Sequence, residues 1–213
     1  MPWYYTPKFI LMTIPLAVIV GLIFHAILVW KDKKNIFWSS LILFTFVFPI
    51  FWIIYQKSNV YGGWRHAMFT YPSIVVFAGL GFNYIIELVS NRKAKIALVA
   101  LPFVMMILPL IHIVKNHPYE YVYFNELAGG VDKAWGNYEL DYYYHSTREA
   151  SEWIKENAEK NGLETDGKIR VATWHVPSVK NYFRNDTNDF KVTFARWYQK
   201  GNIDWDYAVF TIT

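Results

Sequence analysis

The sequence predicts an α-helical membrane region followed by a small α/β domain. Four apolar stretches occupy the first half of the chain, at residues 9–30, 36–55, 68–89 and 96–114. Each holds roughly 20 residues, which as a helix rise about 30 Å and match the hydrocarbon thickness of a bilayer. The chain then turns more polar up to residue 213. We therefore expect residues 1–114 to form a polytopic membrane region with four transmembrane helices.

A bundle of four buried helices in a soluble protein is the alternative interpretation. Such helices would need polar outer faces. The first stretch contains His25 as its only titratable residue, and the third contains only Glu87. The membrane interpretation is therefore favoured.

The charge distribution argues against a nucleic-acid-binding protein. Residues 1–114 hold nine Lys and Arg against two acidic residues, whereas residues 115–213 hold twelve against fifteen. The basic pI of about 9.0 thus comes from the membrane half. A nucleic-acid binder would place its basic residues on the soluble domain.

The loops between the stretches predict an orientation. Six basic residues lie in the first and third loops: Lys31, Lys33, Lys34, Arg92, Lys93 and Lys95. The other short segments hold only Lys8, Lys57 and Arg65. By the positive-inside rule, the first and third loops are cytoplasmic and the C-terminal domain is extracytoplasmic. We expect the membrane to be a bacterial inner membrane or a plasma membrane. Because residues 1–8 do not resemble a cleavable signal, we expect Met1 to be an internal residue of a longer protein.

Beyond the last stretch we expect an aromatic-rich juxtamembrane segment at residues 115–145 and a soluble α/β domain at 146–213, truncated before it closes. Ser146 and Glu149 have the spacing of a capping box and begin a helical pattern that ends near Gly162. A strand at 168–174, a short helix from Pro177 to about Phe183, and strands at 190–194 and 207–213 follow. This order indicates a small α/β layer.

Two groups of residues resemble a known enzyme family. The first is Tyr61-Gly62-Gly63-Trp64-Arg65-His66 with Tyr71-Pro72, and the second runs from His117-Pro118-Tyr119-Glu120 to Trp153 and includes Phe124-Asn125, Gly129-Gly130 and Trp135-Gly136. Together with Pro2-Trp3-Tyr4-Tyr5, they resemble the C-terminal part of a family 39-type membrane glycosyltransferase, the group of the protein O-mannosyltransferases and aminoarabinose transferase-like enzymes.

The resemblance implies a GT-C architecture that transfers a sugar from a polyprenyl-phosphate carrier to an extracytoplasmic acceptor. The catalytic acid of that family belongs to an early outer loop, which this chain does not contain. We therefore assign no catalytic residue and no cofactor to the chain, and expect it to be inactive alone.

Arg65, His66 and Lys8 are the predicted ligands of the donor phosphate. Arg can grip phosphate oxygens in a bidentate fork, and the glycines before Arg65 would let the backbone approach a ligand. An ordinary interfacial Arg is the alternative. Tyr61, Trp64, Glu139 and Asp141 are the candidates for binding a sugar or an acceptor.

Membrane lipids and an acceptor glycan, lipid or protein are the other expected partners, and the histidines show no metal-ligand spacing. A non-catalytic membrane protein whose outer domain binds a glycan or a partner remains an alternative. A transporter is disfavoured, because the spans offer few polar groups beyond Ser39, Ser40 and Thr45.

Overall fold

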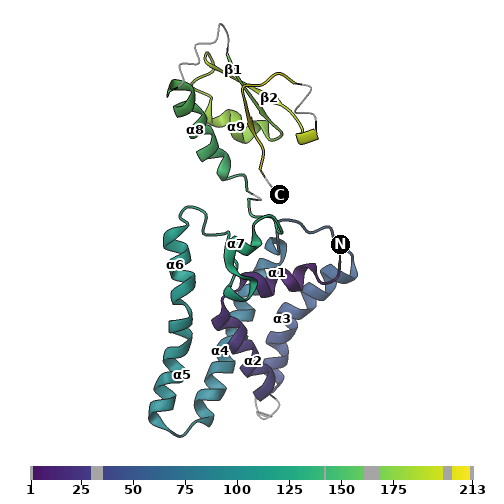
Figure 1. The fold of residues 1–213 in the computed structure, drawn as a ribbon. Helices are drawn as coiled ribbons and strands as arrows, with labels where there is room; N and C mark the ends of the chain where they lie inside the picture. Colours follow the sequence, from purple (N-terminus) through teal and green to yellow (C-terminus); the bar gives the residue numbers. More distant parts are fainter. Residues whose placement is uncertain (1, 30–35, 142, 161–167, 199–202, 212–213) are drawn as a thin grey trace. The chain divides into compact units, whose positions relative to one another are not determined.

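The chain forms two compact units, Met1–Asn137 and Tyr138–Thr213. A computed structural model describes residues 2–29, 36–141, 143–160, 168–198 and 203–211. The boundary between the units lies inside the predicted juxtamembrane segment, so most of that segment belongs to the helical unit (Figure 1).

The first unit is helical. Its elements are α1 (Tyr5–Thr13), α2 (Leu16–Leu28), α3 (Ile36–Tyr55), the 3₁₀ helix η2 (Arg65–Thr70), α4 (Tyr71–Leu88), α5 (Arg92–Met105), α6 (Ile107–Lys115), the 3₁₀ helix η3 (Glu126–Ala128) and α7 (Gly130–Ala134). Three helical segments in the described part of the chain are long and apolar enough to cross a membrane: Ile36–Tyr55, Arg65–Leu88 and Arg92–Lys115. They correspond to the second, third and fourth predicted stretches.

The prediction of one continuous helix over residues 9–30 is wrong. Helices α1 and α2 meet at an angle of 115°, and α2 alone, with 13 residues, rises only about 20 Å. The two helices together are apolar enough for a broken span or a re-entrant loop, so the described residues hold three candidate spans, or four if this pair is counted as one. Pro15 explains the break, because its ring disfavours a helical conformation for the preceding residue. Ile14 is accordingly extended, with φ −87° and ψ 146°.

Helices α2 and α4 pack with their backbones in close contact. A Cβ atom at Gly81 would lie 2.0 Å from the Gly21 carbonyl oxygen, and one at Gly21 would lie 2.5 Å from the Ala78 oxygen. The buried imidazole of His25 stacks on Phe77 at the same interface, with 3.7 Å between ring centroids. Small residues therefore set the distance between these two helices.

The second unit is a parallel α/β layer, as the order of predicted elements indicated. Helix α8 (Ser146–Lys160) precedes strand β1 (Ile169–Thr173), α9 (Val176–Tyr182), β2 (Phe190–Phe194) and β3 (Tyr207–Val209). The strand order is β2-β1-β3, and β1 pairs in parallel with both neighbours. Ser146 is the first residue of α8, and its hydroxyl contacts the Asp141 carboxylate, so the predicted capping box with Glu149 is wrong.

One face of the sheet carries both helices (Figure 1). Ile154 of α8 and Val179 of α9 share a buried cluster with Val171 of β1 and Val209 of β3, and Phe183 completes it. The alternation of β1 explains this arrangement, since Val171 faces the helices and Arg170 the opposite side.

Arg170 joins β1 to the segment that leads into β3. Its guanidinium pairs with Asp206 through Nη2 and Oδ1 at 3.1 Å, and its backbone N–H donates to Asp206 Oδ2 at 2.7 Å. These hydrogen bonds hold the pKa of Asp206 below its ordinary value of 3.8. Asp204 also contacts Arg170, at 3.1 Å, but its side chain is 92% exposed.

Gly81→Ala should destabilise the helical unit by about 2 kcal/mol or more, because the added methyl group meets backbone atoms that cannot move aside alone. Gly79→Ala is the matched control on the same helix, since a Cβ there meets nothing within 4 Å. Thermal unfolding of both variants in one detergent, followed by circular dichroism, checks this. Equal melting temperatures for the two variants would contradict the close helix crossing.

The second unit should lose stability in acid through Asp206. A depressed folded pKa gives stability that is present above the ordinary value of 3.8 and is lost as the pH falls through the lower, folded pKa. Asp206→Asn should remove this part of the pH dependence, and Asp204→Asn should leave it in place. Hydrogen exchange of the β1 amides, corrected for the intrinsic effect of pH, measures it. If hydrogen exchange in both variants shows the same pH dependence as in the wild type, the Arg170–Asp206 pair does not contribute to stability.

Candidate functional site

Tyr61, Arg65 and His66 form a partly exposed group at the N-terminal end of η2, which leads directly into α4. The Arg65 guanidinium carbon is 4.6 Å from the centroid of the Tyr61 ring, a cation–π distance. His66 contacts the same ring edge-on, with 5.1 Å between centroids. Tyr61 and His66 are exposed and Arg65 is half-buried.

Glycine is required next to this group. Gly62 and Gly63 adopt positive φ values of 64° and 68°, which residues with a side chain rarely adopt. A Cβ at Gly62 would lie 3.2 Å from Arg65 Cζ, so the missing side chain makes room for the guanidinium. The space beside Gly62 therefore holds the Arg65 side chain, and not the ligand that the sequence predicts there.

Trp64 attaches the loop to α1. Its Nε1–H donates to the Thr13 hydroxyl at 2.7 Å, and the Thr13 hydroxyl donates to the Phe9 carbonyl at 2.7 Å. The Trp64 ring is 7% exposed and packs edge-on against Tyr71. Predicted as a sugar-binding residue, Trp64 lies in the interior, where it positions the exposed residues beside it.

Asn125 holds the bend between α1 and α2. Its fully buried amide donates to the carbonyl of Leu11 at 2.6 Å and to that of Ile14 at 2.8 Å, and its backbone N–H donates to Met12 at 2.8 Å. The Oδ1 atom accepts from the N–H of Ala128 and caps η3. A residue 111 positions away in the sequence thus satisfies carbonyls that the break at Pro15 leaves without helical partners.

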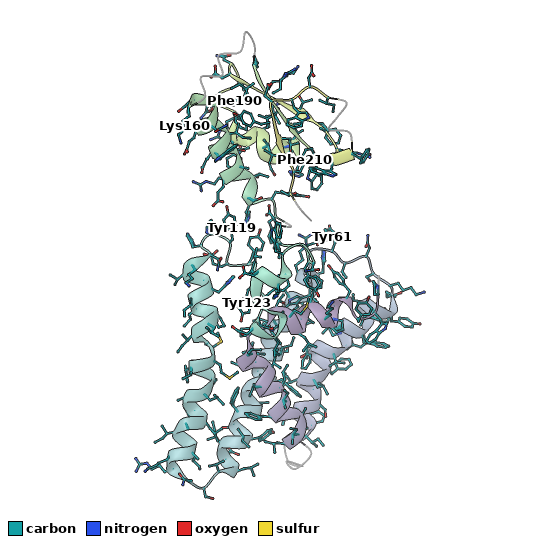
Figure 2. The ribbon with its side chains drawn as sticks, viewed as in Figure 1. Tyr61, Tyr119, Tyr123, Lys160, Phe190 and Phe210 are labelled. Carbon is teal, nitrogen blue, oxygen red and sulfur yellow. The ribbon has the colours of Figure 1, made fainter. Side chains whose placement is uncertain are left out.

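Other aromatic residues lie at the same end of the helical unit. Figure 2 shows Tyr119 near the end of α6, at about the level of Tyr61, and Tyr123 below that level. Burial and the neighbouring Glu126 raise the pKa of Tyr123 to about 12, so this phenol stays protonated at neutral pH. Its ring contacts that of His112, with 5.2 Å between centroids.

The remaining predicted residues have different positions. Lys8 is exposed on α1, beside the buried Phe9, on the helix to which Trp64 is attached. Glu139 and Asp141 belong to the second unit. The Asp141 carboxylate accepts from the backbone N–H of His145 at 2.9 Å and from the Ser146 hydroxyl, so it organises the start of α8.

Among the described residues, no group of three or more His, Asp or Glu side chains is placed to hold a metal ion. No protein-family model, curated protein or solved structure matches the chain. The resemblance to membrane glycosyltransferases therefore stays a prediction.

The arrangement at Arg65 suits an anion. Cations are normally stabilised at the C-terminal ends of helices, whereas the N-terminal end carries a partial positive charge. Arg65 and His66 stand at the N-terminal end of η2, which has no acidic residue in its first turn. A phosphate placed there would be attracted by the helix end and by the guanidinium together.

Asn125→Leu should destabilise the helical unit by about 2–4 kcal/mol, because the buried carbonyl of Ile14 and the partly buried carbonyl of Leu11 lose their donor. Asn137→Leu is the control, since the Asn137 amide also donates to a carbonyl, that of Lys133, but at an exposed position. Thermal unfolding measures the loss, and hydrogen exchange over residues 10–16 reports where it occurs. A loss spread equally over all helices, or none at all, would contradict a local role at the bend.

Proposed function

We propose that this chain is the C-terminal part of an integral membrane glycosyltransferase that takes a sugar from a polyprenyl-phosphate donor. The observation that carries the proposal is the position of Arg65, a cation stacked on an exposed tyrosine at the N-terminal end of an apolar helix long enough to cross a bilayer. The family resemblance of the loop and of residues 117–153 supports the same function.

The exposed surface of the long helices supports an integral membrane location. Only 6% of the apolar window is buried in each of the segments Ile36–Tyr55 and Arg92–Lys115. Phe44 and Phe103 are 57% and 73% exposed, and Val114 is 80% exposed. Leaving apolar surface in water costs roughly 25 cal/mol per Å², so these helices are stable only when lipid or further apolar helices cover them. A soluble bundle would instead have polar outer faces.

The proposed orientation follows from the basic loops. The last apolar segment begins with three basic residues, Arg92, Lys93 and Lys95. The positive-inside rule assigns these residues to the cytoplasmic side of a bacterial inner membrane or a plasma membrane. The opposite ends of the same helices, with Arg65 and the C-terminal unit that follows α6, are then extracytoplasmic. Arg65 would lie near the lipid headgroups, where the phosphate of a polyprenyl carrier resides.

The chemistry proposed for Arg65 is stabilisation of the leaving group. An acceptor hydroxyl would attack the anomeric carbon of the donor sugar, and the bond from that carbon to the phosphate oxygen would break. The departing phosphate takes the electron pair and gains negative charge, which a bidentate guanidinium offsets. His66 and Lys8 would add positive charge nearby. The base that removes the hydroxyl proton would come from outside this chain.

A non-catalytic protein with a ligand-binding outer domain is the second candidate. A groove of about 380 Å³ in the C-terminal unit favours it. Ser40 and Thr45 do not favour a transporter, because both hydroxyls donate to carbonyls of their own helix α3, at 2.7 and 2.6 Å.

Arg65→Ala should weaken binding of a polyprenyl phosphate at least tenfold, because the bidentate phosphate contact is lost. Native mass spectrometry of the chain in lipid nanodiscs, titrated with undecaprenyl phosphate, measures it. Lys57→Ala is the matched control, since Lys57 is an exposed cation in the same loop between α3 and η2. In the enzyme that contains all its spans, Arg65→Ala should lower sugar transfer at least tenfold.

An equal loss of polyprenyl-phosphate binding in Arg65→Ala and Lys57→Ala would mean that Arg65 is only one of several cations that contact lipid headgroups. Unchanged binding and transfer in Arg65→Ala would remove this residue from the mechanism.

A further inference from the structure

The C-terminal unit contains the one N-x-S/T triplet of the sequence. Of all the asparagines in the chain, Asn185 alone is followed two positions later by a hydroxyl residue, Thr187, with Asp186 between them. This triplet is the acceptor sequence for N-linked glycans, and it excludes only proline at its middle position. Because so short a pattern also arises by chance, its structural setting decides how it is interpreted.

The triplet lies in the turn that joins α9 to β2. The side chains of Asn185 and Thr187 are both on exposed residues of this turn. Asn181, in contrast, lies within α9, and Asn188 in the same turn is followed two positions later by Phe190. The acceptor sequence therefore coincides with an exposed turn, which is the kind of position at which folded domains carry glycans.

Neighbouring residues hold this turn and leave the Asn185 side chain uncommitted. The Asp186 carboxylate pairs with Lys155 of α8 at 2.5 Å, and the Thr187 carbonyl accepts from Lys168 Nζ at 2.6 Å. In the described part of the chain, the Asn185 side chain makes no hydrogen bond. A sugar attached to its Nδ2 atom would therefore displace no polar contact of the fold.

The turn lies at the amino end of the sheet. Ile169, the first residue of β1, donates its N–H to the carbonyl of Asp189, at the end of the turn, at 2.7 Å. Helix α8 begins at the opposite, carboxyl end, because Ser146 lines one groove with Thr211, which follows β3. A glycan on Asn185 would extend from the end of the sheet opposite to the one where α8 begins.

The proposed orientation assigns this turn to the side on which N-glycans are added. The basic loops place the C-terminal unit on the extracytoplasmic side of the membrane. Lipid-linked oligosaccharides are transferred to proteins on that same side. Asn185 follows the last apolar segment, which ends at Lys115, so it emerges there in a chain of this topology.

We propose that Asn185 is the acceptor of an N-linked oligosaccharide. The donor is an oligosaccharide on a polyprenyl diphosphate, and a separate membrane-bound oligosaccharyltransferase catalyses the transfer. The Asn185 Nδ2 atom attacks the anomeric carbon, the bond from that carbon to the diphosphate oxygen breaks, and the diphosphate leaves with the electron pair. Nδ2 loses one proton to a base of the transferase, which recognises the Thr187 hydroxyl. The proposal rests on the proposed orientation of the chain, and not on the role proposed for Arg65.

Translation of the complete chain in the presence of endoplasmic-reticulum microsomes tests the proposal. The wild-type chain should gain one glycan, seen as a single electrophoretic mobility shift that peptide N-glycosidase reverses. Deglycosylation in water labelled with ¹⁸O, followed by mass spectrometry, should place the label at position 185. A glycoprotein standard in the same translation confirms that the microsomes are active.

Asn185→Gln and Thr187→Val should abolish the mobility shift, whereas Thr187→Ser should retain it. Asn188→Gln is the matched control, since it makes the same change in the same exposed turn and leaves the triplet intact. Loss of the shift in Asn185→Gln alone therefore cannot be attributed to misfolding. A shift that persists in Asn185→Gln would overturn the proposal.

Cysteine labelling separates a failure of the acceptor site from a failure of the orientation. The sequence has no cysteine, so Asn188→Cys introduces a unique thiol. A membrane-impermeant maleimide should label this thiol only after the microsomes are opened, because the unit is expected on the lumenal side. Protection of the thiol without a glycan on the wild-type chain would overturn the proposal and leave the orientation intact. Labelling in sealed microsomes would overturn both.

Discussion

The helical unit depends on how the chain satisfies its backbone where α1 meets α2. Pro15 ends one helix and starts the next, and the turn leaves carbonyl groups without helical donors. Asn125 supplies those donors from the far end of the unit. The same bend brings Thr13 to Trp64 and so connects α1 to the loop that carries Arg65. One buried amide thereby links the N-terminal helices, the segment after α6 and the exposed cationic group.

This dependence explains where the sequence was informative and where it was not. Length and hydropathy were enough for α3, α4 and the segment Arg92–Lys115, because a long apolar helix is a local property. They failed for residues 9–30, because average hydropathy does not register a single proline. Pro49 and Pro102 lie inside helices that continue past them, so proline alone does not specify a bend. The additional requirement at Pro15 is Asn125, and no local pattern connects the two residues.

In the candidate site, too, local features could be predicted from the sequence and long-range contacts could not. Tyr61, Arg65 and His66 are close in sequence, and the structure brings their side chains together on one short segment. The burial of Trp64 could not be read from the sequence, because its partner Thr13 is 51 residues away. In the C-terminal unit the elements followed from local periodicity, whereas the parallel order β2-β1-β3 did not. Sheet order depends on contacts between segments that are distant in the chain.

The two units differ in the kind of surface that they leave exposed. In the helical unit the long helices satisfy most of their backbone groups within their own segments, and many of the side chains that remain exposed are apolar, as at Phe103 and Val114. Such a surface is suited to lipid, which offers no hydrogen bonds. In the C-terminal unit, what remains open at β3 is backbone, and water or another strand must satisfy it. The long helices of the first unit therefore expose apolar side chains, whereas the sheet edge of the second unit exposes polar backbone. Under the proposed function, Arg65 at the end of an apolar helix would lie near the lipid headgroups, where a lipid-linked phosphate is found.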